Sequence, residues 1–344
     1  MNSTVAIESR DAIVDVAIDL AQRELRPQTL ALDERRAGAV EAAWQSVCDI
    51  GFDHALAPTT DGGVGLEPAT LLACLEEIAA GDGGIAMLVL LANAATLACP
   101  DAAAADGERW ALVPVPPPEV PSGVDLAVGA GGEVDGVLAP ALGALAADGV
   151  VVIDMYGASP TAIAIRSDAA GMSLEPCEPQ LGLRAAANAR IVLSAATAHV
   201  SSALEAAAGA RSLALLRAGT AAIARGTARH ASELARAYAQ TRIQGGVPII
   251  EHDAVRDMLA AMEIRLRACR LNRDEEPLDE LAALAAKVSA TDAAVATTTD
   301  AVQVFGGAGY MHETGAEKLM RDAKHCQLFP EPNWVAAASL MRVR

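Results

Sequence analysis

The sequence predicts a mainly helical protein with one small β domain in the middle of the chain. Apolar residues recur at helical spacing through the first and last thirds. Between them, prolines cluster and short β-type runs follow. The 344 residues suffice for two or three packed domains, and abundant alanine beside only 3% aromatic residues favours close helix–helix packing. We expect a helical domain over residues 1–109, a shortened β domain over 110–200 and a C-terminal four-helix bundle over 201–344.

The first third is predicted to be helical because its apolar residues share faces. Residues 39–50 show this pattern around Trp44 and Val47, and a turn-rich loop follows at Pro58–Leu66. The most apolar stretch is Ile85–Cys99. It is shorter than the ~20 residues that cross a bilayer, so we expect a buried helix and no membrane span.

The middle of the chain changes composition near Trp110. Five prolines fall between residues 114 and 121, which disfavours a helix and marks a domain junction. Runs typical of strands follow at residues 149–153, 162–165 and 190–193. These runs predict a small, mostly antiparallel β domain.

Helical periodicity returns after Ser201. It covers residues 201–240, about 254–273 and about 278–304. Between the first two stretches, the segment from Tyr238 to Arg256 is predicted to close one helix on Gly245-Gly246 and to open another. Long helices joined by short connections predict an antiparallel bundle.

Charge and cysteine content limit the classes of function. The net charge of −18 argues against nucleic acid or an anionic membrane as the main partner. The six cysteines are scattered, without CxxC spacing or histidines at metal-ligand offsets, so we expect reduced thiols, no metal site and a cytoplasmic protein. The N-terminal residues lack the basic and apolar regions of a signal peptide.

One stretch near the C-terminus is specific enough to indicate a family. It contains Gln303, Gly306, Gly307, Gly309 and Tyr310, and then Glu317-Lys318 and Arg321-Asp322-Ala323-Lys324. This string resembles the C-terminal signature of the acyl-CoA dehydrogenase family. Residues 58–66 resemble a loop of the family's first helical domain, and residues 182–193 resemble the turn into the last strand of its middle domain. The resemblance covers nearly the whole chain and implies the family's fold.

The resemblance also implies a cofactor site. In the family, the Gln-x-x-Gly-Gly segment meets the diphosphate and adenosine end of an FAD that the neighbouring subunit mainly binds. Residues 242–246 resemble the family's Arg-x-Gln-Phe-Gly, with Gly245 in the place of Phe, and a guanidinium suits a diphosphate. The structural alternatives are a helix-end cation for the arginine and an ordinary C-cap for the glycines. The resemblance thus assigns FAD, shared across a subunit interface, to Arg242, Gln244, Gln303, Gly306 and Gly307.

The catalytic base of the family has no counterpart here. In the family reaction, a glutamate removes the α proton of an acyl-CoA and the flavin accepts the β hydrogen as hydride. Its two family positions correspond to Pro330 and to Leu216, which precedes Arg217. Glu331 stands one residue late between two prolines, where a capping or exposed carboxylate is the structural alternative. We therefore assign no catalytic residue, and Glu331 is the one candidate base.

The motifs that hold the flavin ring in the family are also missing. The segment from Val115 to Val128 is short and rich in proline where the family has Thr-Glu-Pro…Gly-Ser-Asp. Residues 135–143 stand where Trp-Ile-Thr is expected, without Trp, Thr or Ser. The resemblance therefore predicts a middle domain without its own flavin-ring site.

Kept and missing motifs together predict a partner subunit. The chain resembles the short subunits of α2β2 acyl-CoA dehydrogenases that process steroid side chains as CoA thioesters. We expect it to complete the FAD site of a full-length subunit in a heterotetramer, with the acyl-CoA bound at the partner's site. Two other interpretations stay open, an autonomous homo-oligomeric flavoenzyme that uses Glu331 and a flavin-free scaffold or assembly protein of the same fold.

Overall fold

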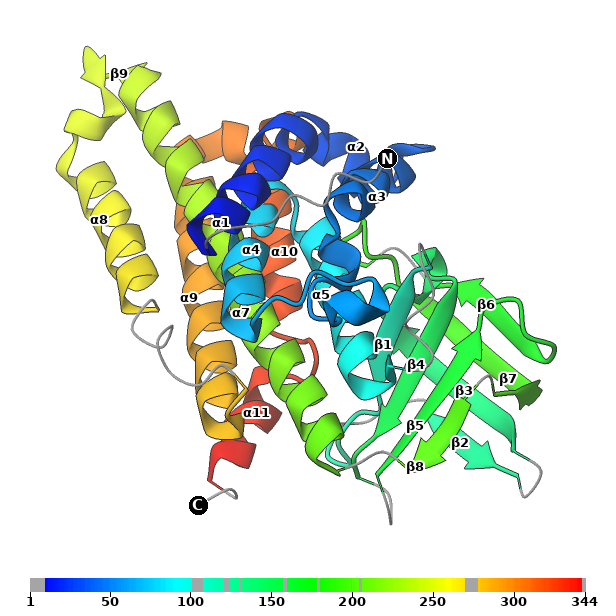
Figure 1. Ribbon diagram of the computed structural model, residues 1–344. Helices are drawn as coiled ribbons and strands as arrows, with labels where there is room; N and C mark the ends of the chain where they lie inside the picture. Colours follow the sequence, from blue (N-terminus) through cyan, green and yellow to red (C-terminus); the bar gives the residue numbers. More distant parts are fainter. Residues whose placement is uncertain are drawn as a thin grey trace.

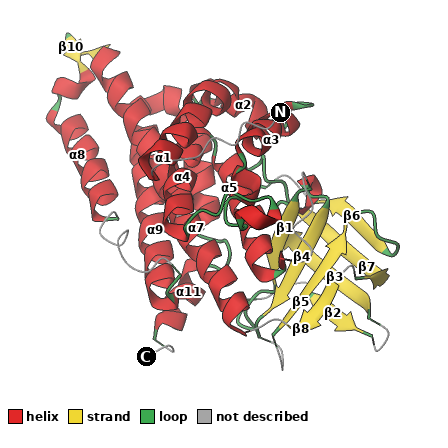
Figure 2. Cartoon of the chain, in the orientation of Figure 1, coloured by secondary structure: helices red, strands yellow, loops and turns green. Residues whose placement is uncertain are grey.

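The computed structural model describes residues 10–100, 108–120, 124–129, 132–156, 160–177, 180–198, 200–203, 206–269 and 278–341. A helical part, a β domain and a second helical part follow one another along the chain (Figures 1 and 2). The predicted fold class, mainly helical with a small β middle domain, is confirmed. The two helical parts pack against each other, and the β domain lies to one side of them (Figure 2).

The N-terminal part is built around one buried helix. Asp82 begins this helix by accepting hydrogen bonds from the backbone N–H groups of Gly84 and Ile85. All but one of its residues are buried, as expected for so apolar a stretch, and none of the described helices is long and apolar enough to cross a membrane. The α-helices of this part are α1 (Arg10–Asp19), α2 (Thr29–Asp33), α3 (Ala39–Ile50), α4 (Pro68–Gly81) and the buried α5 (Gly83–Ala98).

The β domain consists of two four-stranded sheets. The first has the order β1-β4-β5-β8 and is antiparallel except for the parallel pair β1–β4, and the second is antiparallel with the order β2-β3-β7-β6. Apolar side chains of both sheets form a core of their own. The strands are β1 (Trp110–Pro114), β2 (Asp125–Val128), β3 (Glu133–Ala141), β4 (Gly149–Asp154), β5 (Thr161–Arg166), β6 (Met172–Pro176), β7 (Ala189–Thr197) and β8 (Val200–Ala203).

Four helices alternate in direction in the C-terminal part. The first and third, α7 and α9, run parallel, because Tyr238 stacks on Phe305 near one end and Arg217 meets Glu280 near the other. A β-hairpin, β9 (Ile243–Gln244) and β10 (Val247–Pro248), joins α7 to α8. A short helix, α11 (Asn333–Leu340), ends the described chain. The four bundle helices are α7 (Ala206–Thr241), α8 (Asp253–Ala268), α9 (Glu280–Phe305) and α10 (Ala316–Cys326).

The two helical parts share one core because α7 lies close to α4 and α5. Gly226 of α7 permits this approach, since a Cβ there would lie 2.0 Å from the carbonyl oxygen of Glu76. Apolar residues of α1, α3, α4, α5 and α7 and of β1 and β4 belong to a single buried cluster. The helices therefore form a continuous body that positions both the exposed end of the bundle and the contact with the β domain.

Candidate functional site

The residues predicted to bind FAD lie at one end of the helical bundle. Tyr238 of α7 stacks on Phe305, the last residue of α9, with ring centroids 4.3 Å apart. This contact holds the C-terminal ends of the two helices together. Two of the predicted residues follow α7 and three lie at the end of α9, and all five are exposed: Arg242, Gln244, Gln303, Gly306 and Gly307.

A tight hairpin follows Arg242, and the next helix, α8, begins at Asp253, inside the segment predicted to open it. The helix α7 ends at Thr241, before the two glycines that the sequence interpretation placed at its end. Gly245 and Gly246 connect the hairpin strands with φ angles of 64° and 88°. Positive φ at both central positions is typical of a type I′ turn, which glycine adopts without strain. The hairpin projects past the end of α7 (Figure 1), so the arginine stands at its exposed base.

The two glycines after α9 differ in what the fold requires of them. Gly306 has φ 61° and ψ −137°, a conformation that side chains other than glycine rarely adopt. Gly307 has no positive φ, and a Cβ added to it would meet no atom within 4 Å. The backbone therefore explains the first glycine but not the second. A group that approaches from outside the chain would explain the second.

The three segments that depart from the family motifs meet at a single cavity. This cavity, of about 350 Å³, lies between the β domain and the loop after α10. Pro116 and Val120 line it from the proline-rich segment, and Pro140 and Leu142 line it from the segment in place of Trp-Ile-Thr. Pro330, at the family's base position, lines it from the third side. Both altered ring-binding segments and the commoner base position therefore border the same space.

The described lining of this cavity, called here the proline cavity, has no hydroxyl and no acidic or basic side chain apart from one histidine. Its polar residues are Gln180, Asn188 and His325. The amide of Gln180 is used within the fold, because its Nε2 donates to three backbone carbonyls of the next six residues and its Oε1 accepts from the N–H of Asn188. Few groups remain to hydrogen-bond the polar edge of a flavin ring.

The candidate base, Glu331, is buried and paired with Arg217. Its Oε1 accepts a hydrogen bond from Nε of the arginine at 2.9 Å, and the two side chains are only 2% and 5% exposed. It does not belong to the described lining of the proline cavity. Leu216, at the other family base position, is fully buried. The carboxylate is thus neither the exposed group of the structural alternative nor a base open to the cavity.

Lys287 of α9 holds the loop that carries Glu331. Its Nζ donates to the carbonyl oxygens of Glu331 and Gln327 at 2.5 and 3.1 Å and to Oδ1 of Asn333 at 2.6 Å. Burial lowers the pKa of this ammonium group to about 8. Together with Arg217 of α7, the lysine bonds residues 327–333 to two helices of the bundle.

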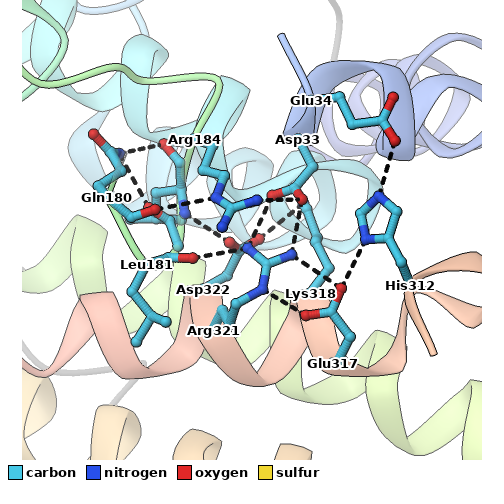
Figure 3. Close-up of polar contacts among 12 residues, drawn as sticks. Asp33, Glu34, Gln180, Leu181, Arg184, His312, Glu317, Lys318, Arg321 and Asp322 are labelled. Atoms are coloured by element: carbon cyan, nitrogen blue, oxygen red, sulfur yellow. Dashed lines mark hydrogen bonds and ion pairs between the residues drawn. The ribbon is translucent and has the colours of Figure 1, made fainter. Parts of the chain in front are cut away.

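The Arg-Asp-Ala-Lys segment joins three parts of the fold (Figure 3). Arg321 makes a two-point ion pair with Asp33 of α2, with N–O distances of 3.1 and 2.8 Å. The same guanidinium donates to the carbonyl oxygen of Leu181, next to the β domain, and to Glu317 on its own helix. The arginine therefore ties α10 to the N-terminal helices and to the middle domain.

Lys318 makes a second tie one turn earlier on α10. Its buried Nζ lies 2.7 Å from Oδ2 of Asp82, the cap of α5, and 2.8 Å from Oδ2 of Asp322. Burial opposes the charge of the lysine, but the two carboxylates outweigh this effect and raise its pKa above the ordinary value. The charged side chains of Lys318, Arg321 and Asp322 therefore stabilise the fold. The described residues contain no group of side chains that could hold a metal ion.

Family models match both helical parts of the chain. Residues 8–105 match the acyl-CoA dehydrogenase N-terminal domain, and residues 205–329 match the acyl-CoA dehydrogenase C-terminal domain. Together these matches cover more than half of the sequence. The chain belongs to the acyl-CoA dehydrogenase family. It is thereby related to oxidoreductase flavoproteins.

Individual relatives resemble the whole chain. Cyclohex-1-ene-1-carbonyl-CoA dehydrogenase of Geobacter metallireducens is 28% identical, over 95% of this chain and 96% of the relative. The structure of butyryl-CoA dehydrogenase from Megasphaera elsdenii matches with a TM-score of 0.83 and 20% identity, over 97% of each chain. The FAD complex of PigA matches with a TM-score of 0.85 and 19% identity, over 100% of this chain and 99% of the other.

The residues present fit the two ends of an FAD unequally. At the exposed end of the bundle, Arg242 offers a guanidinium suited to a diphosphate, and Gly307 leaves space for a close approach. The proline cavity, in contrast, offers walls of proline and leucine and few hydrogen-bonding groups. The described lining of the cavity does not fit a flavin ring.

Several residues of these sites were missed from the sequence. Lys287 lies in no recognised motif, and only the tertiary structure brings it to the loop after α10. Gln180 and His325 lie outside the segments compared with the family, although both line the proline cavity. The Arg217–Glu331 pair spans 114 residues, a separation at which no local pattern indicates a contact.

Proposed function

We propose that this chain is the partner subunit of a heteromeric acyl-CoA dehydrogenase. Its exposed bundle end completes the diphosphate and adenosine end of an FAD whose ring site and catalytic glutamate belong to a full-length subunit. That FAD, when bound, accepts the β hydrogen of the acyl-CoA as hydride. Arg242 neutralises part of the diphosphate charge, and the Gln303 and Gly306–Gly307 segment lets its backbone approach the cofactor.

The observation that carries this proposal is the meeting of three altered segments at one cavity. The ring-binding segments and the base position are separate in the sequence, yet Pro116, Leu142 and Pro330 line the same space. Sequence changes unrelated to the flavin would have no reason to alter both ring-binding segments and the base position around the same cavity. The pattern supports loss of one function, flavin-ring binding with catalysis, in a chain that keeps the fold.

The environment of Glu331 argues against an autonomous flavoenzyme. To take a proton from a substrate, the Glu331 carboxylate would have to leave Arg217 with only the half-exposed Glu280 as its counter-ion. The exposed glycines and Arg242 argue in turn against a flavin-free scaffold, since the fold itself has no use for a glycine at 307. The autonomous flavoenzyme does not explain the buried pairing of Glu331, and the flavin-free scaffold does not explain Gly307.

The proposed complex is a heterotetramer in the cytoplasm. Its acyl-CoA substrate binds at the full-length subunit. Steroid side chains are the acyl groups we propose, because the motifs of this chain resemble those of the short subunits in α2β2 enzymes of that class. The family membership supports an acyl-CoA substrate in general, and the resemblance to the short subunits narrows the proposed acyl group to steroid side chains.

Replacing Arg242 tests the assignment of the exposed bundle end. In a complex with the full-length subunit, Arg242→Ala should weaken FAD retention by roughly 10- to 100-fold, since a hydrogen bond to a charged group contributes ~1.5–3 kcal/mol. The matched control is Arg267→Ala on α8, where the guanidinium pairs with Glu263 on the surface. FAD release is followed by flavin fluorescence after dilution. Equal retention in the two variants would overturn the assignment.

A further inference from the structure

The proline cavity is large enough for a ligand of its own. Its volume of about 350 Å³ exceeds the ~150 Å³ of a buried apolar cavity that holds benzene. Leu181 and Leu328, which are 55% and 54% exposed, belong to its lining and stand next to solvent. The space can therefore be reached from outside, and two fused rings are a suitable size of occupant.

The lining excludes charged ligands. Within the described residues it contains no lysine, arginine, aspartate or glutamate. A phosphate or carboxylate placed there would lose its water without gaining a counter-ion, and so would an ammonium group. The remaining candidates are uncharged molecules that are mostly apolar.

The imidazole of His325 provides the lining with a hydrogen-bond acceptor. Nδ1 of His325 lies 3.0 Å from the carbonyl oxygen of Gly182, which can only accept, so Nδ1 carries the proton and Nε2 of the neutral ring is an acceptor. Burial lowers the pKa of this imidazole, which favours the neutral ring. Nε2 makes no hydrogen bond among the described residues, whereas Oδ1 of Asn188, although also unpaired, is closed off from any water-sized space. A ligand that donates a hydrogen bond to this half-buried imidazole nitrogen is therefore favoured.

We propose that the proline cavity binds an uncharged hydrocarbon ring system that carries a hydroxyl group, with the hydroxyl donating to Nε2 of His325. The inference rests on the proposed function in one respect, namely that no flavin ring of this chain occupies the cavity. It adds a ligand site on the subunit that we take to be non-catalytic. A substrate-like molecule and a product both meet this requirement, which is an apolar body with one hydrogen-bond donor.

Three naphthalene derivatives test the site by calorimetric titration of the full chain. 2-Naphthol has the required donor, 2-methoxynaphthalene has the same shape without it, and 2-naphthoate carries a charge. We expect saturable binding of naphthol, roughly tenfold weaker binding of the methoxy compound and no binding of the naphthoate. No saturable heat with naphthol, or equal affinity for naphthol and naphthoate, would overturn the proposal.

Two substitutions locate the binding. Val120→Trp on the half-buried rim should fill the cavity and abolish naphthol binding without disturbing the core. His325→Phe should reduce the preference for naphthol over methoxynaphthalene, whereas His230→Phe, at a half-buried histidine of α7 outside the lining, should preserve it. Unchanged binding in Val120→Trp, with thermal unfolding that shows a folded chain, would place the ligand elsewhere and sink the proposal.

A visible spectrum of the same preparation separates the two proposals. If the isolated chain is yellow with one FAD per protomer, the proposed function fails, and naphthol would compete with the ring. If it is colourless and naphthol gives no heat, the ligand site alone fails. If it is colourless and binds naphthol as expected, both stand.

Discussion

Glu331 has one meaning in the sequence, a displaced catalytic base, and another in the structure, where it pairs with Arg217. A carboxylate one place from a family base position looks like a base displaced in sequence. Its burial beside a guanidinium of α7 makes it a structural anchor for the loop after α10. Removing either partner would leave the other charged and buried, which is the costly way to break an ion pair.

The substitution Glu331→Gln should therefore affect stability and not flavin chemistry. We expect the free energy of unfolding to fall by about 3–5 kcal/mol, because Arg217 loses its buried counter-ion. Glu175→Gln is the matched control, since its pair with Arg190 is 56% and 45% exposed and should contribute less than about 1 kcal/mol. Urea denaturation of the two variants makes the comparison. A stable Glu331→Gln variant whose complex has lost all activity would mean that the glutamate is a base after all.

His312 supplies a pH-dependent contact at the same scale. Its imidazole bonds Glu317 through Nδ1 at 2.9 Å and Glu34 through Nε2 at 3.1 Å (Figure 3). The hydrogen bond with Glu317, and next to it the bond with Glu34, raise the pKa of His312 above its ordinary value, although burial opposes the charge. A raised pKa in the folded state means that the stabilisation is fully present below pH ~6.5 and is lost as the pH rises through the folded-state value.

His312→Gln should accordingly destabilise the protein more at pH 6 than at pH 9. The difference in unfolding free energy between wild type and variant is measured by urea denaturation at each pH. In a Glu317→Gln background the effect should shrink, because the main partner of the imidazolium is gone. A difference that grows toward pH 9 would show that the protonated ring is not the stabilising form.

The helix α10 is the element that ties the three parts of the chain together. Its Arg321 meets Asp33 of the first part and the carbonyl oxygen of Leu181 beside the β domain, and its Lys318 meets the cap of α5. Ion pairs that join separate layers fix their relative position, and here they are nearly fully buried. Residues 317–324, part of the stretch that most clearly indicated the family, thus hold the three parts of this chain together.

Two lysines of this helix give a matched test. Lys318→Met leaves Asp82 and Asp322 without a cation and should cost about 3–5 kcal/mol of unfolding free energy. Lys324→Met, at an exposed position of the same helix, should change it by less than about 0.5 kcal/mol. Denaturant titrations of both variants decide the matter. Losses of similar size would show that the buried cluster does not join the domains.

At the scale of the whole molecule, the fold followed from periodicity, whereas the sites did not. Helical spacing and the β-branched runs were local signals, so α5, β4, β5 and β7 lie close to where they were expected. Strands β1, β2, β3, β6 and β8 were not predicted individually, because prolines, glycines and small residues weaken the pattern there. The domain limits near residues 109 and 200 remain predictions, and β8 extends past the second of them.

The candidate sites depend on contacts that the sequence does not encode locally. That Gly307 lacks a structural reason became apparent only from the space around it. That Pro116, Pro140 and Pro330 surround one cavity required the packing of the β domain against the loop after α10. Motif comparison located the altered segments, and the three-dimensional packing showed that they line one cavity.

The stoichiometry of FAD tests whether one flavin is held between this chain and a full-length subunit. The chain would be purified alone and co-expressed with a full-length acyl-CoA dehydrogenase subunit, and FAD per protomer read from the visible spectrum of each preparation. We predict no flavin in the chain alone and one FAD for each pair of unlike subunits in the complex. A yellow homo-oligomer with one FAD per chain would contradict the claim.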